Sequence, residues 1–258
     1  MNVGGSIVQV CPDKDSVARA AADVFVSLAP QPHEKRTPFR VVLAGGTTPA
    51  ALYALLASAE YRHRVAWKQV MFFFGDERAV PSDHPDSNYR AAHDALFIPL
   101  DIPPQNVYQM KGLGSDLDAA AAEYERILQS AFERMRVPQF DLIFLGMGSD
   151  GHTASLFPGS PALAERTRLV VPVTDAPKPP PRRLTLTFPV LNAARLVLFM
   201  VTGADKAPAL REVLRGAVSP DRYPAQCVRP GATRLAWLVD EAAGGLLQKE
   251  DLCLKPLT

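Results

Sequence analysis

Apolar residues follow two alternating patterns along the chain. Short runs of mostly apolar residues, rich in Val, Leu, Ile and Phe, predict buried strands. These runs lie at Ser6–Val10, Arg40–Ala44, Gln69–Gly75, Phe140–Gly146, Arg168–Val173, Arg183–Val190, Arg195–Gly203 and Thr233–Asp240. Between them, apolar residues recur at every third or fourth position, which predicts amphipathic helices. This alternation predicts an α/β fold, in which helices cover both faces of a mostly parallel sheet.

The clearest helix pattern runs from Asp13 to Leu28, and Asp13 is suited to cap its N-terminus. Further helices are predicted over Ala50–Ala59, Asn88–Phe97, Asp116–Met135 and Asp205–Gly216. Pro172 and Pro189 interrupt strand-like runs and therefore indicate sheet edges or strand ends. The segment Gln31–Pro38 reads as a polar loop, and the Pro-rich segment Asp175–Arg183 as an ordered loop or a small lid.

Polar motifs follow four of the predicted strands directly. They are GGTT after Arg40–Ala44, DER after Gln69–Gly75, GSDGH after Phe140–Gly146, and TGADK at the end of Arg195–Gly203. In open parallel sheets, ligands bind beyond the carboxyl ends of the strands. The four motifs are therefore expected to meet at one edge of the sheet and to form a binding site there.

Chain length and net charge limit the number of domains and the kinds of partner that we expect. The chain has 258 residues, enough for a full core, and we expect one domain over residues 1–258. The net charge of +1 provides no broad attraction to nucleic acid or to an anionic membrane, so neither is an expected partner. An anionic ligand must instead be held by a few placed groups. Oligomeric state is left open, as a monomer or a weak dimer.

The three cysteines, Cys11, Cys227 and Cys253, are odd in number and form no C-x-x-C motif. This argues against a disulfide framework or a zinc site and favours a reducing cytosol. The N-terminus lacks the pattern of a signal peptide, and no apolar run approaches the ~20 residues of a membrane span. We therefore expect a cytoplasmic protein, and we expect no metal because His, Cys and carboxylates do not cluster at ligand spacing.

The stretch GMGSDG, residues 146–151, matches the G-x-G-x-x-G pattern of dinucleotide-binding proteins. That fingerprint requires a helix directly after the glycines, whose N-terminus receives the pyrophosphate. Pro158, Gly159 and Pro161 limit any helix here to about one turn, so a dinucleotide site is disfavoured. The same loop holds Asp150 and His152. A histidine can act as a general base near neutral pH, a carboxylate can set its tautomer, and the glycine amides can stabilise an oxyanion. The alternative is that His152 only bonds locally.

Other residues at these strand ends have both a binding and a structural interpretation. One interpretation of the GGTTP stretch is a phosphate-binding site at a helix start, formed by the backbone of Gly45 and Gly46 and the hydroxyls of Thr47 and Thr48. The other is a capped turn that has only a structural role, with Pro49 in the first helical turn.

Arg78 is suited to clamp a phosphate or carboxylate, and Asp76 or Glu77 to bind sugar hydroxyls, unless DER is a solvated turn. Arg183 and Lys206 can neutralise a phosphate or remain surface charges. The other histidines, His33, His63, His84 and His93, are expected to be solvated.

These motifs together resemble the 6-phosphogluconolactonase family. The resemblance rests on VVLAGGTTPAALYALL, FFFGDERAVPSDHPDSNY, DLIFLGMGSDGHTASLFPG, PKPPPRRLTLTFPVLNAA and VTGADKAPALREVL, which cover most of residues 41–214 in the family's order. It implies a three-layer α/β/α sandwich similar to glucosamine-6-phosphate deaminase. It also implies cofactor-free, metal-free hydrolysis of 6-phospho-D-glucono-1,5-lactone to 6-phosphogluconate in the oxidative pentose phosphate pathway. The small sugar-phosphate lactone is then the expected partner.

The same resemblance assigns roles by position. His152 corresponds to the proposed general base that activates water, and Asp150 to the acidic residue beside it. The substrate loop corresponds to Gly45, Gly46, Thr47 and Thr48, and the cations near the phosphate to Arg78, Arg183 and Lys206. Which cation meets the phosphate stays open.

Two alternatives are weaker. The deaminases on this fold resemble Asp-Glu-Tyr where this chain has Arg78 as the third residue, and carry a glutamate that the stretch His152–Ser160 lacks. A non-catalytic sugar-phosphate sensor would have no need of His152.

Overall fold

The computed structural model describes residues 7–32, 38–114, 116–133, 135–230 and 234–248. Within these residues, six strands form one sheet with the spatial order β1 (Ile7–Cys11), β9 (Arg234–Asp240), β8 (Leu196–Val201), β5 (Leu142–Leu145), β2 (Phe39–Leu43) and β3 (Val70–Phe74). Every neighbouring pair is parallel. The predicted mostly parallel sheet is confirmed.

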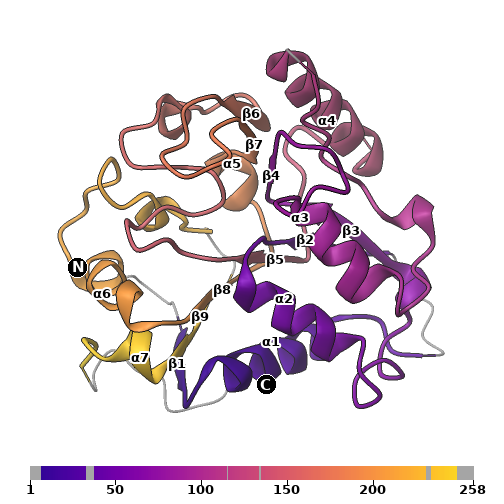
Figure 1. Cartoon of the computed structure of the whole chain (residues 1–258), viewed down its shortest axis with the longest axis horizontal. Coiled ribbons are helices and arrows are strands. Elements are labelled where there is room, and N and C mark those ends of the chain that lie inside the picture. Colours follow the sequence, from indigo (N-terminus) through magenta and orange to yellow (C-terminus); the bar gives the residue numbers. More distant parts are fainter. Residues whose placement is uncertain (1–6, 33–37, 115, 134, 231–233, 249–258) are drawn as a thin grey trace.

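Helices flank this sheet on both sides. They are α1 (Lys14–Leu28), α2 (Thr47–Leu56), α3 (Asn88–Ala92), α4 (Leu117–Ala131), α5 (Phe188–Leu191), α6 (Ala207–Arg215) and α7 (Glu241–Gly244). Figure 1 shows α1 and α2 along one side of the large sheet and α5 on the other. Burial agrees with this layering, since every residue of β5 and β8 is buried. The fold is thus the expected α/β arrangement in layers.

The strand order contains a switch point beside β2. From β2 the chain moves outward to β3, and it then returns to place β5 on the other side of β2. The loops that leave β2 and β5 therefore diverge in opposite directions. Such a point opens a crevice beyond the carboxyl ends of the strands, where ligands bind in open α/β sheets.

A second, antiparallel sheet of three strands was not anticipated. It has the order β4 (Asp76–Arg78), β7 (Arg183–Leu186) and β6 (Val170–Val173). The predicted strand Arg183–Val190 is wrong in its second half, because β7 ends at Leu186 and α5 follows. DER forms a strand rather than part of a loop, since β7 supplies a pairing partner. Pro172 lies on edge strand β6, as expected.

Several predicted helix bounds also need correction. Asp13 caps α1 as predicted, accepting a hydrogen bond from the Ser16 N–H at 2.7 Å. Helix α2 begins at Thr47 instead of Ala50, and Gly46 with φ +107° is its N-cap, so neither threonine caps it. A left-handed φ is accessible to glycine without steric cost. Helix α4 ends at Ala131, short of Met135.

Some expectations concern residues outside the described ranges. They include Ser6 and Thr233 at strand starts, His33 and most of the Gln31–Pro38 loop, and Cys253. Among the helices that the structure describes, none combines the length and apolar character that a membrane span requires.

Asp240, at the end of β9, fastens the turn that follows β8. Its carboxylate accepts the Gly203 N–H with both oxygens at 3.0 Å and caps α7 through the Ala243 N–H at 2.7 Å. The carboxylate is buried, with 8% of the residue exposed. Asp240 therefore sets the backbone just before Lys206.

Replacing Asp240 with Ala should lower the free energy of unfolding by about 2–4 kcal/mol, since hydrogen bonds to charged groups contribute ~1.5–3 kcal/mol and a buried donor loses its acceptor. Urea unfolding at neutral pH measures this. Asp240→Asn keeps one acceptor oxygen and should lose less than half as much. An unchanged urea midpoint in Asp240→Ala would show that the contact does not stabilise the fold.

Candidate active site

The four loops that follow β2, β3, β5 and β8 meet at one cavity of about 240 Å³. Gly45 and Gly46 line it from the first loop, Gly75 from the second with Asp76 and Arg78 of the adjoining strand β4, Gly146, Gly148 and His152 from the third, and Lys206 from the fourth. Lys178 and Arg183 close it from the Pro-rich segment and β7, and Asn88 from α3. The predicted meeting of the four motifs at one sheet edge is confirmed.

A larger groove of about 740 Å³ lies elsewhere, between the turn after α3 and helix α4. Its walls are mainly aromatic and aliphatic, including Tyr89, Phe97 and Ile127. None of the four loop motifs contributes to it. The smaller cavity is the candidate active site, because it collects the polar groups at the strand ends.

His152 and Asp150 form a hydrogen-bonded pair in the loop after β5. The ring Nδ1 of His152 lies 2.5 Å from Oδ1 of Asp150, and the side chains are 16% and 33% exposed. With Nδ1–H donating to the carboxylate, Nε2 carries the lone pair of the neutral ring. Partial burial alone would raise the pKa of Asp150, but the hydrogen bond from His152, together with the charge of Lys178, holds it well below its ordinary value. Asp150 is thus a stable anionic acceptor.

Gly148 permits this arrangement. A Cβ at this position would collide with the His152 ring and with the Asp150 carboxylate. The Phe157 ring contacts the His152 ring at 4.5 Å between centroids. The imidazole is therefore held between the Gly148 backbone, Asp150 and Phe157.

The amides of two loop glycines are not available to an oxyanion. Gly148 N–H donates to the His152 carbonyl at 2.9 Å, and Gly151 N–H donates to the Gly148 carbonyl at 3.0 Å. These bonds close the loop on itself. The expectation that these glycines offer backbone donors to a substrate is therefore wrong for Gly148 and Gly151. The cost of leaving a backbone N–H unpaired explains why a tight loop uses them internally.

Arginines from two strands stand next to each other in the cavity wall. Arg78 of β4 is paired directly opposite Arg183 of β7 in the strand register. Like charges in such a pair repel. The buried Nε of Arg78 has no hydrogen-bond partner among the described residues, although its Nη1 donates to the Asp86 carbonyl. An anion bound at Arg78 would relieve this repulsion.

The acidic residues of DER are buried in the structure. Asp76 accepts hydrogen bonds from the Ser155 hydroxyl at 2.6 Å and the Asn88 amide at 3.2 Å, and one oxygen lies 4.0 Å from Nη1 of Arg183. Glu77 accepts the N–H groups of Asn88 and Tyr89 at the start of α3, both at 2.8 Å.

Burial raises the pKa of Glu77, against the effect of its backbone donors. Glu77 thus holds α3 in place, while Asp76 lines the cavity.

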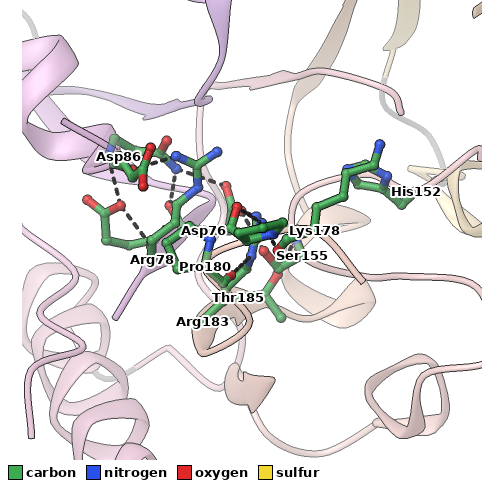
Figure 2. Close-up of polar contacts among 12 residues, drawn as sticks. Asp76, Arg78, Asp86, His152, Ser155, Lys178, Pro180, Arg183 and Thr185 are labelled. Atoms are coloured by element: carbon green, nitrogen blue, oxygen red, sulfur yellow. Dashed lines mark hydrogen bonds and ion pairs between the residues drawn. The ribbon is translucent and has the colours of Figure 1, made fainter. Parts of the chain in front are cut away.

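Two lysines line the cavity. Lys206 pairs with Asp205 at 2.8 Å, and its side chain is 23% exposed. Lys178 comes from the Pro-rich segment, and Figure 2 shows its side chain extending toward the side where His152 lies. Its charge lowers the pKa of both Asp150 and Asp205. Lys178 and Asn88 were not singled out from the sequence, although Lys178 stands among prolines in a quoted motif.

Three of the predicted site residues do not line the cavity. Thr47 is exposed at the start of α2, and the Thr48 hydroxyl contacts the Thr202 hydroxyl at 2.7 Å, which links the loops after β2 and β8. Asp150 lies behind His152. These positions place Thr48 and Asp150 as supports of the cavity wall.

Comparison with known proteins places the chain among sugar-phosphate enzymes. Residues 12–237 match the family model described as glucosamine-6-phosphate isomerases/6-phosphogluconolactonase. A 6-phosphogluconolactonase of Mycobacterium tuberculosis is 40% identical over 247 residues, which are 94% of this chain and 98% of that protein.

Among solved structures, a 6-phosphogluconolactonase from Trypanosoma cruzi superposes with a TM-score of 0.83 at 28% identity, covering 96% of this chain and 98% of the other. A monomeric glucosamine-6-phosphate deaminase, with a TM-score of 0.78 at 24% identity, covers 93% and 99% and shares the fold.

Proposed function

The chain belongs to the glucosamine-6-phosphate isomerase/6-phosphogluconolactonase family, and we propose that it hydrolyses 6-phospho-D-glucono-1,5-lactone to 6-phosphogluconate with His152 as general base. As an enzyme it is a carboxylic ester hydrolase of the lactonase type. The observation that carries the mechanistic part is the His152–Asp150 pair in a cavity whose other walls carry four cations, Arg78, Lys178, Arg183 and Lys206.

The cations of the cavity account for binding of the substrate phosphate in this proposal. A sugar phosphate carries close to two negative charges, and charge-assisted hydrogen bonds to phosphate are the strongest that side chains make. Arg78, whose buried Nε has no hydrogen-bond partner within the part of the chain that the structure describes, and the flexible ammonium groups of Lys178 and Lys206 can converge on it. We propose that the phosphate lies among these groups and that the lactone carbonyl lies beside His152.

In the proposed reaction, one proton moves from water to His152 and then from His152 to the leaving oxygen. Nε2 of His152 removes a proton from a water as the water oxygen bonds to the lactone carbonyl carbon, which becomes tetrahedral and anionic. When the carbonyl re-forms, the bond from this carbon to the ring oxygen breaks, and the imidazolium returns its proton to the leaving oxygen. Asp150 accepts Nδ1–H throughout and stabilises the imidazolium. The carboxylic acid product then ionises.

The substrate is a strained ester, so positioning and one base provide enough acceleration without a covalent intermediate.

The deaminase alternative differs in its products, which makes it directly testable. Purified protein should convert the lactone and should release no ammonia from glucosamine 6-phosphate. Release of ammonia at a comparable rate would replace the proposed function with deamination. We also propose the cytosol as its compartment, because Cys11 and Cys227 form no disulfide with any residue that the structure describes.

Activity is expected to survive chelation. The charges that a metal would supply are provided by arginine and lysine side chains, and His152 and Asp150 bond to each other instead of pointing at a shared ion. Prolonged dialysis against EDTA should therefore change kcat/KM by less than about twofold. Loss of a Lewis-acid metal would instead remove several kcal/mol of transition-state stabilisation and lower kcat/KM far more. A large loss that zinc restores would contradict this assignment.

A further inference from the structure

Arg183 is buried and uses most of its hydrogen-bond donors inside the protein. Its Nε donates to the Pro180 carbonyl at 2.9 Å, and its Nη2 donates to the carbonyls of Lys178 at 2.8 Å and Pro179 at 3.3 Å. The residue is 4% exposed. One guanidinium therefore binds three consecutive carbonyls of the Pro-rich segment, as Figure 2 shows for the residues it labels.

The guanidinium itself is fixed from two other directions. Nη1 lies 4.0 Å from a carboxylate oxygen of Asp76, and the plane lies over the Phe157 ring at 5.4 Å from its centroid. Asp76 is held by Ser155 and Asn88, and Phe157 packs on His152. Burial lowers the pKa of Arg183, against the charge of Asp76, but the group stays protonated at neutral pH.

The segment that Arg183 holds carries an exposed cation into the cavity. Lys178 is an exposed residue, yet it lines the cavity and its charge acts on Asp150. The prolines on its C-terminal side have no N–H groups with which to fix the segment. Besides the Arg183 bonds, the segment is closed by the Ala176 N–H, which donates to the Pro181 carbonyl at 3.0 Å.

We propose that Arg183 is a positioning residue that holds the backbone at Lys178, so that the Lys178 ammonium meets the substrate phosphate. This proposal rests on the proposed function and departs from the expectation that Arg183 itself contacts the phosphate. A guanidinium presents its donors in a rigid planar fork, so it holds several carbonyls in one fixed geometry, whereas the ammonium of lysine is a compact charge on a flexible stem. The position therefore calls for arginine even though its charge is turned inward.

A double-mutant cycle tests the proposal. Lys178→Met should raise KM for the lactone by about 10- to 100-fold with kcat little changed, as expected for loss of one charge-assisted phosphate contact. Arg183→Gln should raise KM by a similar factor. If Arg183 acts through Lys178, the double variant should have a KM within about threefold of the worse single variant. Multiplication of the two effects would show that Arg183 binds the phosphate independently and would overturn the proposal.

Hydrogen exchange of the peptide around residues 174–182 separates positioning from contact. Arg183→Gln should speed exchange there, and Lys178→Met should not, since the bonds from Arg183 reach main-chain carbonyls. Arg183→Lys keeps the buried charge beside Asp76 and serves if Arg183→Gln does not fold; it too should loosen this peptide and raise KM. Normal exchange and normal KM in Arg183→Lys would refute the proposal. Arg182→Gln is the matched control, because this exposed neighbour bonds to Gly114 outside the cavity.

The same cycle applied to the Kd of inorganic phosphate does not depend on catalysis. If the wild-type protein lacked lactonase activity, the proposed function would fail, while phosphate affinity and hydrogen exchange would still decide the role of Arg183. Non-additive losses of phosphate affinity support positioning, and additive losses contradict it.

Discussion

Replacing His152 with Ala is expected to reduce kcat for lactone hydrolysis at least about 100-fold, the usual size of a general-base contribution. The variant loses the ring nitrogen that accepts the proton from water, while the cations of the cavity stay in place. Binding of 6-phosphogluconate should therefore change by less than about threefold. Steady-state kinetics and calorimetric titration of the product measure the two quantities separately.

His93→Ala is a suitable control, because this histidine lies in the larger groove and its side chain is 40% exposed. It should retain wild-type kinetics. Near-normal turnover in His152→Ala would contradict the base assignment. Loss of product binding together with kcat would instead indicate that His152 contributes to the binding of the ligand.

Gly148→Ala is expected to reduce kcat by a similar factor, about 100-fold, without removing any group that reacts. The added methyl would occupy the space of the His152 ring and the Asp150 carboxylate, so their hydrogen bond must break or the loop must shift. A displacement of about 1 Å in a catalytic group can cost about 100-fold in rate. The variant should stay folded, because the loop lies at the end of β5 beyond the sheet.

Gly146→Ala provides the comparison within the same loop. A Cβ at Gly146 would meet no protein atom within 4 Å other than those of the adjacent residues, so it would leave the His152–Asp150 pair in place, and this variant should lose far less activity than Gly148→Ala. Circular dichroism and thermal unfolding check that both variants are folded. Equal losses in the two variants would show that the loop tolerates no added methyl anywhere, and the specific role assigned to Gly148 would then be wrong.

The sheet and the place of the site could be predicted because both follow from local patterns. Apolar strands followed directly by polar motifs are enough to bring GGTT, DER, GSDGH and TGADK to one edge, once the strands are parallel. The rejection of a dinucleotide site also followed from local chemistry, since Pro158 and Pro161 prevent the required helix. After β5 the structure has turns and a short 3₁₀ helix, Pro161–Ala164.

The parts that were missed depend on contacts between distant segments. Asp76–Arg78 becomes a strand only because Arg183–Leu186, over 100 positions away, pairs with it. That pairing places Arg78 opposite Arg183, which no local pattern reveals. The threonine hydroxyls after Gly46 could cap a helix, but Gly46, with a positive φ, occupies the N-cap position of α2. No local pattern points to Lys178, because the hydrogen bond from Arg183 to its carbonyl forms only in the folded Pro-rich segment.

The most direct test of the account is the rate at which purified protein hydrolyses freshly generated 6-phospho-D-glucono-1,5-lactone, measured above spontaneous hydrolysis. The product can be followed by coupling it to a 6-phosphogluconate dehydrogenase. We predict that catalytic amounts of wild-type protein raise the rate far above background, and that an equal amount of His152→Ala adds at most about one hundredth of that increase. A wild-type rate equal to the background would contradict the central claim.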